Sequence, residues 1–163
     1  MTKTTTCIDI YGKEFQVPAE NLAWRPSVYG IVIKDGNILL SKQFGDRYDL
    51  PGGGLDLGET PEEGVIREVK EETGIDVKNP RLVGFENSYF QSSHSKENKS
   101  YHCIMLYFMC EYSGGELSTD GFDEDELAYA ELAEWTPVEQ LDTLELASTV
   151  DYRSHIRKAI LDQ

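Results

Sequence analysis

Three glutamates at positions 68, 71 and 72 are the side chains of this sequence with the clearest capacity for chemistry. On a helix, residues three and four apart share a face, so Glu68, Glu71 and Glu72 would gather three carboxylates. Such like charges destabilise a helix unless a cation neutralises them. Carboxylate oxygens are hard ligands that favour Mg²⁺, Mn²⁺ or Ca²⁺. The alternative is a solvated acidic face, and the triad alone does not decide between the two.

The helix that must carry these glutamates is predicted over residues 60–74. Thr60 is a suitable N-cap, Pro61 fits the first helical position, and Glu63 completes a T-x-x-E capping box. Gly74 is typical of the residue that ends a helix. The segment therefore has a defined beginning and a defined end.

The faces of this helix follow from its rotation of about 100° per residue. Val65, Ile66 and Val69 share an apolar arc that is expected to pack inward. Gly64 falls beside the carboxylates, where the lack of a side chain is expected to leave access open. The sequence thus predicts an anionic pocket next to the core.

The rest of the chain alternates strand signals with turns. Asp35-Gly36 between two apolar runs predicts a hairpin, and a glycine-rich loop at 51–54 precedes the helix. Further strands or hairpins are expected at 8–17, 27–33, 37–43, 81–90, 101–112 and 132–135, an exposed loop at 92–100, and a C-terminal helix ending near residue 161. This order predicts an α+β or αβα layered domain.

The spacing of residues 53–75 matches a known signature. The segment fits Gx5Ex7REUxEExGU, with U apolar, at every defined position. Seven fixed identities would coincide by chance in about one sequence in a million. The chain therefore resembles the Nudix (MutT-like) hydrolase family. The Asp-Gly hairpin, the segment 48–53 and the segment 134–137 extend the resemblance over roughly residues 25–160.

The resemblance implies a fold and a domain organisation. It implies the Nudix fold, an α+β arrangement with a mixed β-sheet sandwiched between α-helices. The length of 163 residues fits one domain over 1–163, with a core at about 25–160 and residues 1–24 as an N-terminal strand or hairpin extension.

The resemblance also implies an activity. Family members use Mg²⁺ or Mn²⁺ to hydrolyse a diphosphate linkage in a nucleoside diphosphate derivative or a nucleoside triphosphate, by means of metal-activated water. The implied metal ligands are the backbone carbonyl of Gly53 and the carboxylates of Glu68, Glu71 and Glu72. Together with Arg67, which is expected to orient the carboxylates, these three glutamates form the implied catalytic set.

The general base and a further ligand remain open at this point. Glu68 or a residue of the acidic loop 120–126 is expected to take the proton of the water. Asp125 and Glu126 of this loop are candidates for an additional metal ligand. The alternative for both is a solvated acidic loop. Glu59 is expected to support the loop or the carboxylates.

Substrate contacts are expected outside the signature. Tyr48 is an aromatic candidate for stacking on a base, although strand-face packing is the alternative for it and for other tyrosines. Arg25 and Arg47 lie near the entrance strands and are candidates for phosphate contacts, with surface solvation as the alternative. Phe90 stands where ADP-ribose-type members tend to carry proline, which disfavours an ADP-ribose substrate.

Composition restricts the partners. The net charge of −15, from 15 basic and 30 acidic residues, argues against nucleic-acid binding and membrane-surface binding. A small nucleotide-type molecule is the expected partner, and a homodimer is a family expectation. No apolar run approaches 18 residues and the N-terminus has no signal-peptide pattern, so a cytoplasmic location is predicted. Cys7, Cys103 and Cys110 are expected to be buried free thiols.

A second function remains open beside hydrolysis. A Nudix-like module can recognise a nucleotide without cleaving it, and would then serve as a sensor. Such modules usually lack signature glutamates or carry a DNA-binding domain. This sequence retains every glutamate of the signature and shows no helix-turn-helix pattern. Metal-dependent hydrolysis is therefore favoured.

Overall fold

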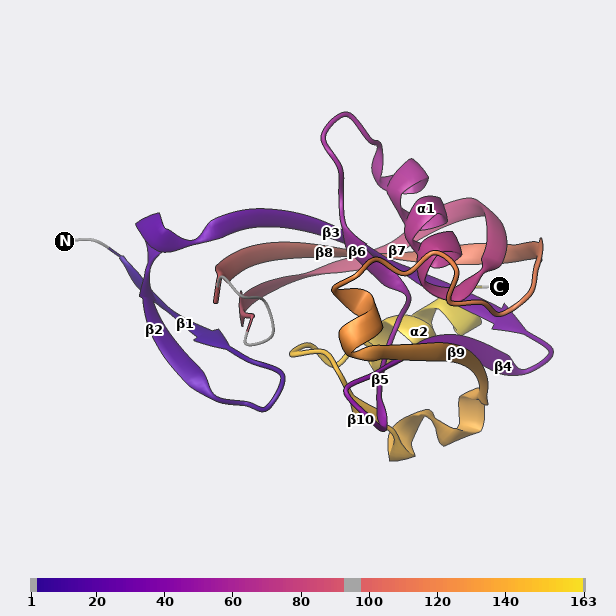
Figure 1. The fold of residues 1–163 in the computed structure, drawn as a ribbon. Helices are drawn as coiled ribbons and strands as arrows, with labels where there is room; N and C mark the ends of the chain where they lie inside the picture. The colour runs from indigo at the N-terminus through magenta and orange to yellow at the C-terminus, as the bar shows by residue number, and fades with distance from the viewer. Residues whose placement is uncertain (1–2, 93–97, 163) are drawn as a thin grey trace.

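The computed structural model of the protein describes residues 3–92 and 98–162 (Figure 1). Most of the loop predicted at 92–100 lies outside these ranges. The strands are β1 (Thr4–Ile8), β2 (Glu14–Pro18), β3 (Ala23–Lys34), β4 (Asn37–Gln43), β5 (Arg47–Asp49), β6 (Gly52–Gly54), β7 (Ile75–Gln91), β8 (Ser100–Gly115), β9 (Ala130–Pro137) and β10 (Glu145–Leu146). The helices are α1 (Pro61–Thr73) and α2 (Arg153–Leu161), with short 3-10 turns η1 (Ala19–Asn21), η2 (Glu126–Ala128) and η3 (Val138–Thr143).

The described strands form one mixed sheet. Its order is β10-β5-β4-β3-β8-β7-β1-β2, with β6 paired to β3 and β9 paired to β4. The pairs β3–β8, β1–β7 and β5–β10 are parallel, whereas the other pairs are antiparallel. The predicted mixed sheet is therefore confirmed.

The two helices cover opposite faces of this sheet. Alternate residues of a strand point to opposite faces, so β3 contributes to two separate cores. The core on the α1 side includes Val28, Val32, Val65, Val69 and Phe108. The core on the α2 side includes Tyr29, Ile31, Tyr107, Ile156 and Ala159. This αβα arrangement is the predicted fold class.

Helix α1 has the ends that the sequence predicts. The Thr60 side chain accepts a hydrogen bond from the Glu63 backbone N–H, and the Glu63 carboxylate accepts one from the Thr60 N–H. Gly74 ends the helix at φ 78°, in the left-handed region that favours glycine. The close approach of α1 to β3 requires Gly30, because a Cβ there would lie 2.5 Å from a methyl group of Val69.

One prediction about the faces of α1 is wrong. Val65 and Val69 are fully buried, but Ile66 is 37% exposed. The helix packs on β3 through the two valines, whose methyl groups lie against Gly30, and Ile66 lies at the far edge of the apolar arc and stays partly exposed. The buried stripe of α1 is therefore narrower than the sequence pattern indicates.

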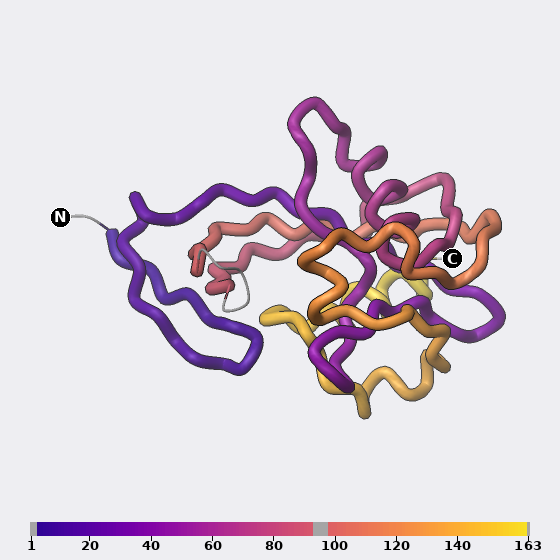
Figure 2. Tube along the Cα trace, viewed as in Figure 1, coloured from indigo at the N-terminus to yellow at the C-terminus, as the bar shows by residue number. Residues whose placement is uncertain are grey.

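The two predicted hairpins are both present. Asp35 and Gly36 have φ values of 51° and 75° between β3 and β4, as expected for an Asp-Gly turn. Strands β1 and β2 form the N-terminal hairpin with a turn around Gly12. Figures 1 and 2 show this hairpin at the end of the molecule away from α1.

The cysteines are free and buried, as predicted. Cys103 belongs to the core beneath α2, whereas Cys110 belongs to the core beneath α1. Within the described ranges, no helix is both long enough and apolar enough to cross a membrane.

Candidate active site

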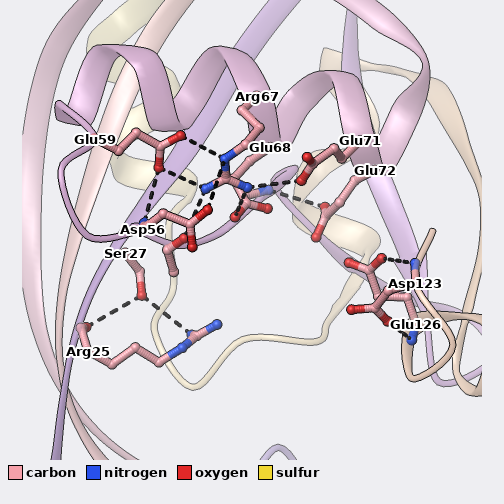
Figure 3. Close-up of polar contacts among 12 residues, drawn as sticks. Arg25, Ser27, Asp56, Glu59, Arg67, Glu68, Glu71, Glu72, Asp123 and Glu126 are labelled. Atoms are coloured by element: carbon pink, nitrogen blue, oxygen red, sulfur yellow. Dashed lines mark hydrogen bonds and ion pairs between the residues drawn. The ribbon is translucent and has the colours of Figure 1, made fainter. Parts of the chain in front are cut away.

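Helix α1 and the loop before it place the signature residues together. Figure 3 shows Arg67, Glu68, Glu71 and Glu72 projecting from one side of α1. Glu68 is buried and lies against β6, since a Cβ at Gly53 would be only 2.8 Å from a Glu68 carboxylate oxygen. Any side chain at position 53 would displace this carboxylate. Glycine therefore keeps the carboxylate and the backbone of the loop in contact.

Arg67 joins three carboxylates. Its Nη1 donates to Glu68 Oε1 and to Glu71 Oε2, each at 2.9 Å, and its Nε donates to Glu59 Oε1 at 2.7 Å. The hydrogen bond to Glu59 raises the pKa of Arg67 above its ordinary value, and the same contact lowers the pKa of Glu59. Arg67 therefore stays charged and fixes the orientation of its neighbours.

Glu72 is held by two other elements. Its Oε2 accepts a hydrogen bond from the Ser41 hydroxyl of β4 at 2.7 Å and from the Gly52 N–H at 3.2 Å. Burial raises the pKa of Glu72 well above its ordinary value, although these two hydrogen bonds act in the opposite direction. Burial also raises the pKa of Glu68. The negative charge of this site is therefore costly in the absence of a cation.

The acidic loop adds a fourth carboxylate. Glu126 and Glu72 line one small cavity together with Ser41, Phe122 and Tyr129. Glu126 is oriented by the Asp123 N–H, which donates to its Oε2 at 2.8 Å. Burial raises the pKa of Glu126. Asp125, the other candidate of this loop, is exposed and does not line the cavity.

The donor atoms suit a hard divalent cation. The side chains gathered here present carboxylate oxygens, a ligand type that Mg²⁺ and Mn²⁺ prefer. Over residues 3–92 and 98–162, however, no three His, Cys, Asp or Glu side chains are already arranged as a metal-binding group. The reason lies in the contacts described above: Arg67 lies between Glu68 and Glu71, and Glu72 turns toward Ser41.

Arg25 lies on the other side of the site from the acidic loop (Figure 3). A Cβ at Gly54 would be 3.4 Å from Arg25 Nε, so the guanidinium lies beside the loop of the signature. It also packs over the ring of Tyr101 at 5.7 Å and donates to the Ser27 hydroxyl at 3.4 Å. Arg25 forms no ion pair with a described carboxylate.

Arg47 and Tyr48 have other neighbours. Arg47 Nη1 donates to the backbone carbonyls of Ile10 and Leu146, at 3.2 and 3.4 Å, and thereby links the N-terminal hairpin to β10. The side chain of Tyr48 hydrogen-bonds to Glu134, which raises the pKa of Tyr48. These contacts bring neither residue to the carboxylates of α1. Strand β5 carries both residues toward β10 instead.

A substitution at Arg47 tests this placement. Arg47→Met is expected to lower the free energy of unfolding by about 1–2 kcal/mol, because two hydrogen bonds to backbone carbonyls are lost. The KM for substrate should stay within about twofold of the parent value, because Arg47 is not expected to form an ion pair with the substrate. Urea unfolding and steady-state kinetics measure the two quantities. A large rise in KM with unchanged stability would instead indicate that Arg47 contacts the substrate.

Gly64 has a different role from the expected one. A Cβ at this position would collide with Leu55 and would lie 3.0 Å from Glu59 Oε2. Gly64 thus allows the loop of the signature to pack against α1, rather than leaving a path to the carboxylates. Sequence reasoning also missed Ser41, which only the pairing of β4 with its neighbours brings to Glu72.

The fold and the site together define a class: an αβα domain with a carboxylate-rich loop–helix–loop on its mixed sheet. The sequence pattern of the NUDIX domain family matches residues 23–158. This chain belongs to the NUDIX family.

Similar proteins agree with this assignment. An ADP-ribose pyrophosphatase of Methanocaldococcus jannaschii is 39% identical over 110 residues, which are 65% of this chain and 61% of the relative. An NAD-capped RNA hydrolase, NudC, of Vibrio atlanticus is 35% identical over 130 residues, 77% of this chain and 42% of the relative. The chain therefore matches only part of the length of these relatives.

A solved structure shows the same fold at low sequence identity. The NUDIX domain of Shewanella oneidensis NrtR, crystallised with ADP ribose, aligns with a TM-score of 0.64 over 90% of this chain and 92% of that domain, at 17% identity.

Proposed function

We propose that this protein hydrolyses a diphosphate linkage in a nucleoside diphosphate derivative, with Mg²⁺ or Mn²⁺ as cofactor. The observation that carries the proposal is the set of four carboxylates around the loop–helix of a NUDIX domain. Desolvation raises the pKa of three of them, Glu68, Glu72 and Glu126, so a divalent cation would relieve a real electrostatic cost.

The residues that would hold the cation are those nearest to the loop and the helix: the carbonyl of Gly53 and the carboxylates of Glu68, Glu71, Glu72 and Glu126. A divalent ion bound there lowers the pKa of a bound water and neutralises charge on phosphoryl oxygens. Arg67 keeps Glu68 and Glu71 in place from one side. Ser41 and Gly52 keep Glu72 in place from the other side.

Glu126 is the better of the two candidates for the general base. Glu68 accepts a hydrogen bond from the Arg67 guanidinium, which occupies one of its oxygens and opposes the rise that burial causes in its pKa. Glu126 has no ion pair with a described cation, and burial raises its pKa above the ordinary value. A carboxylate with such a pKa accepts the proton of an attacking water more readily.

Arg25 is proposed to contact a phosphate of the substrate. Arg25 is half-buried, with its guanidinium beside Gly54, and it forms no ion pair with a described carboxylate, although the charge of Glu68 is near enough to raise the Arg25 pKa. Burying a cation without an ion pair costs free energy, and an anionic ligand bound beside the cation would offset that cost. The phosphate would then be held between Arg25 and the cation at the α1 carboxylates.

The substrate class rests on the relatives. The name of one relative specifies ADP-ribose and that of another NAD-capped RNA, and both contain a nucleoside diphosphate linked to a further group. The net charge of −15 favours a small molecule over RNA for this chain. Although Phe90 disfavours ADP-ribose, this compound belongs in the substrate panel.

The test is a panel of diphosphates incubated with the protein and Mg²⁺ or Mn²⁺. The panel contains ADP-ribose, NAD, a UDP-sugar, a nucleoside triphosphate and NAD-capped RNA. Products are separated by chromatography, and ¹⁸O-water identifies the phosphorus that receives the solvent oxygen. Turnover of at least one small molecule is expected. Saturable binding of ADP-ribose without any product would favour the non-catalytic sensor instead.

A further inference from the structure

A second cavity lies where residues 3–22 meet β3, β7 and β8, and none of the α1 carboxylates lines it. Its volume is about 290 Å³, close to the lower end of the range for small-molecule sites. It is lined by Lys3, Thr5, Ala19 and Leu22 of the N-terminal segment and by Trp24 of β3, Tyr89 of β7 and His102 of β8. Its lining includes no residue of the signature segment 53–75.

Three aromatic rings, on the neighbouring strands β3, β8 and β7, line this cavity. The ring of His102 lies 4.8 Å from that of Trp24, edge to face, and 4.6 Å from that of Tyr89. Asn87 Oδ1 lies 2.7 Å from His102 Nε2 and fixes the orientation of the imidazole. The rings are thus held in place by one another and by β7.

The indole of Trp24 still has a free surface. Trp24 is 63% exposed, an unusual state for the largest apolar side chain. Aromatic faces of this kind are the surfaces on which nucleobases stack. The cavity therefore offers room and a contact surface for a planar ring.

Lys3, which also lines this cavity, supplies a positive charge. The chain has 30 acidic residues, yet Lys3 forms no ion pair with any described residue. A ligand that reaches Lys3 from the rings would gain from carrying an anionic group. A nucleotide combines the two features that such a ligand needs, a planar base and an anionic phosphate.

We propose that this cavity binds a nucleotide, with its base against Trp24 and its phosphate near Lys3. Two sources fit this chemistry: the nucleoside end of the diphosphate substrate, or a separate nucleotide. Trp24 and Arg25 are consecutive residues of β3, so their side chains point to opposite faces of the sheet, and kinetic measurements decide between the two sources. The existence of the site does not depend on the hydrolysis proposed above.

The experiment uses Trp24 as its own reporter. The chain has two tryptophans, so Trp135→Phe leaves Trp24 alone. AMP is titrated in the presence of EDTA, and the fluorescence of Trp24 should be quenched to saturation. Ribose 5-phosphate, which lacks the base, should give no change. Adenosine, which lacks the phosphate, should bind about fivefold more weakly than AMP, as expected for one exposed ion pair.

Two variants separate specific from non-specific binding. Lys3→Gln should weaken AMP binding about fivefold and leave adenosine binding unchanged. The matched control is Lys78→Gln, an exposed lysine of β7 outside the cavity, which should change neither. Calorimetry on the full chain without the Trp135 substitution reads the same binding if that substitution disturbs the fold. An unsaturable response to AMP, or equal AMP affinity in parent and Lys3→Gln, would overturn the proposal.

The source of the nucleotide follows from kinetics with Mg²⁺. If the KM for the substrate rises in Lys3→Gln by the same factor as the AMP dissociation constant, the substrate itself occupies the cavity. If KM is unchanged while AMP binding weakens, the cavity holds a separate nucleotide. Both results support the site. A protein that hydrolyses nothing in the panel but still binds AMP in EDTA would contradict the proposed function alone.

Discussion

Glu72→Gln is expected to lower kcat at least about 100-fold while the protein stays folded. The amide keeps one oxygen that can accept the hydrogen bonds of Ser41 and Gly52, so the side chain should remain in place. It removes the negative charge that would hold a cation. Steady-state kinetics over a range of Mg²⁺ concentrations measure the loss, and near-ultraviolet circular dichroism measures the fold.

The control for this substitution lies on the same helix. Glu62→Gln changes an exposed glutamate in the first turn of α1, and kcat should stay within about twofold of the parent because no metal contact is lost. A Glu72→Gln protein that retains normal activity would remove this carboxylate from the reaction. A variant that unfolds instead would mean that Glu72 serves the structure.

Asp49→Asn is expected to stabilise the protein at alkaline pH but not at acid pH. Asp49 lies at the end of β5, where its Oδ1 accepts the Leu50 N–H at 2.8 Å, a bond that asparagine can keep. Burial raises the pKa of Asp49 to about 7. The carboxyl therefore binds its proton more tightly in the folded protein than in the unfolded chain, where its pKa is about 3.9.

The direction of the pH effect follows from this difference. Below about pH 3.9 the carboxyl is protonated in both states, and burial costs little. Between about pH 4 and pH 7 the unfolded chain ionises first, so the folded state loses stability as the pH rises. Above about pH 7 the loss is constant. It is at most about 4 kcal/mol, and partial exposure of Asp49 reduces the expected value to about 2 kcal/mol.

Urea unfolding at pH 4 and pH 8 in EDTA measures this effect. Asp49→Asn should be more stable than the parent by about 2 kcal/mol at pH 8 and nearly equal to it at pH 4. Asp46→Asn is the control, since Asp46 is exposed and its ion pair with Lys42 contributes little. An advantage of Asp49→Asn that is the same at both pH values would refute the assigned cause.

Local signals in the sequence determined the framework of the site. Thr60, Glu63 and Gly74 defined the ends of α1 because capping depends on contacts between residues a few positions apart. Asp35-Gly36 defined a hairpin because the left-handed conformations of that turn suit these residues. The spacing of Glu68, Glu71 and Glu72 placed three carboxylates on one side of the helix for the same reason, since helical geometry is local.

The tertiary structure alone decided which distant groups meet these carboxylates. Ser41 reaches Glu72 from 31 residues away, and Arg47 reaches the carbonyl of Ile10 from 37 residues away. Neither contact leaves a periodic pattern in the sequence, because strand order and register are set by how the whole sheet packs. Ile66 and Gly64 show the same limit: their helical faces were readable, but what covers each face depends on β3 and on the loop carrying Leu55.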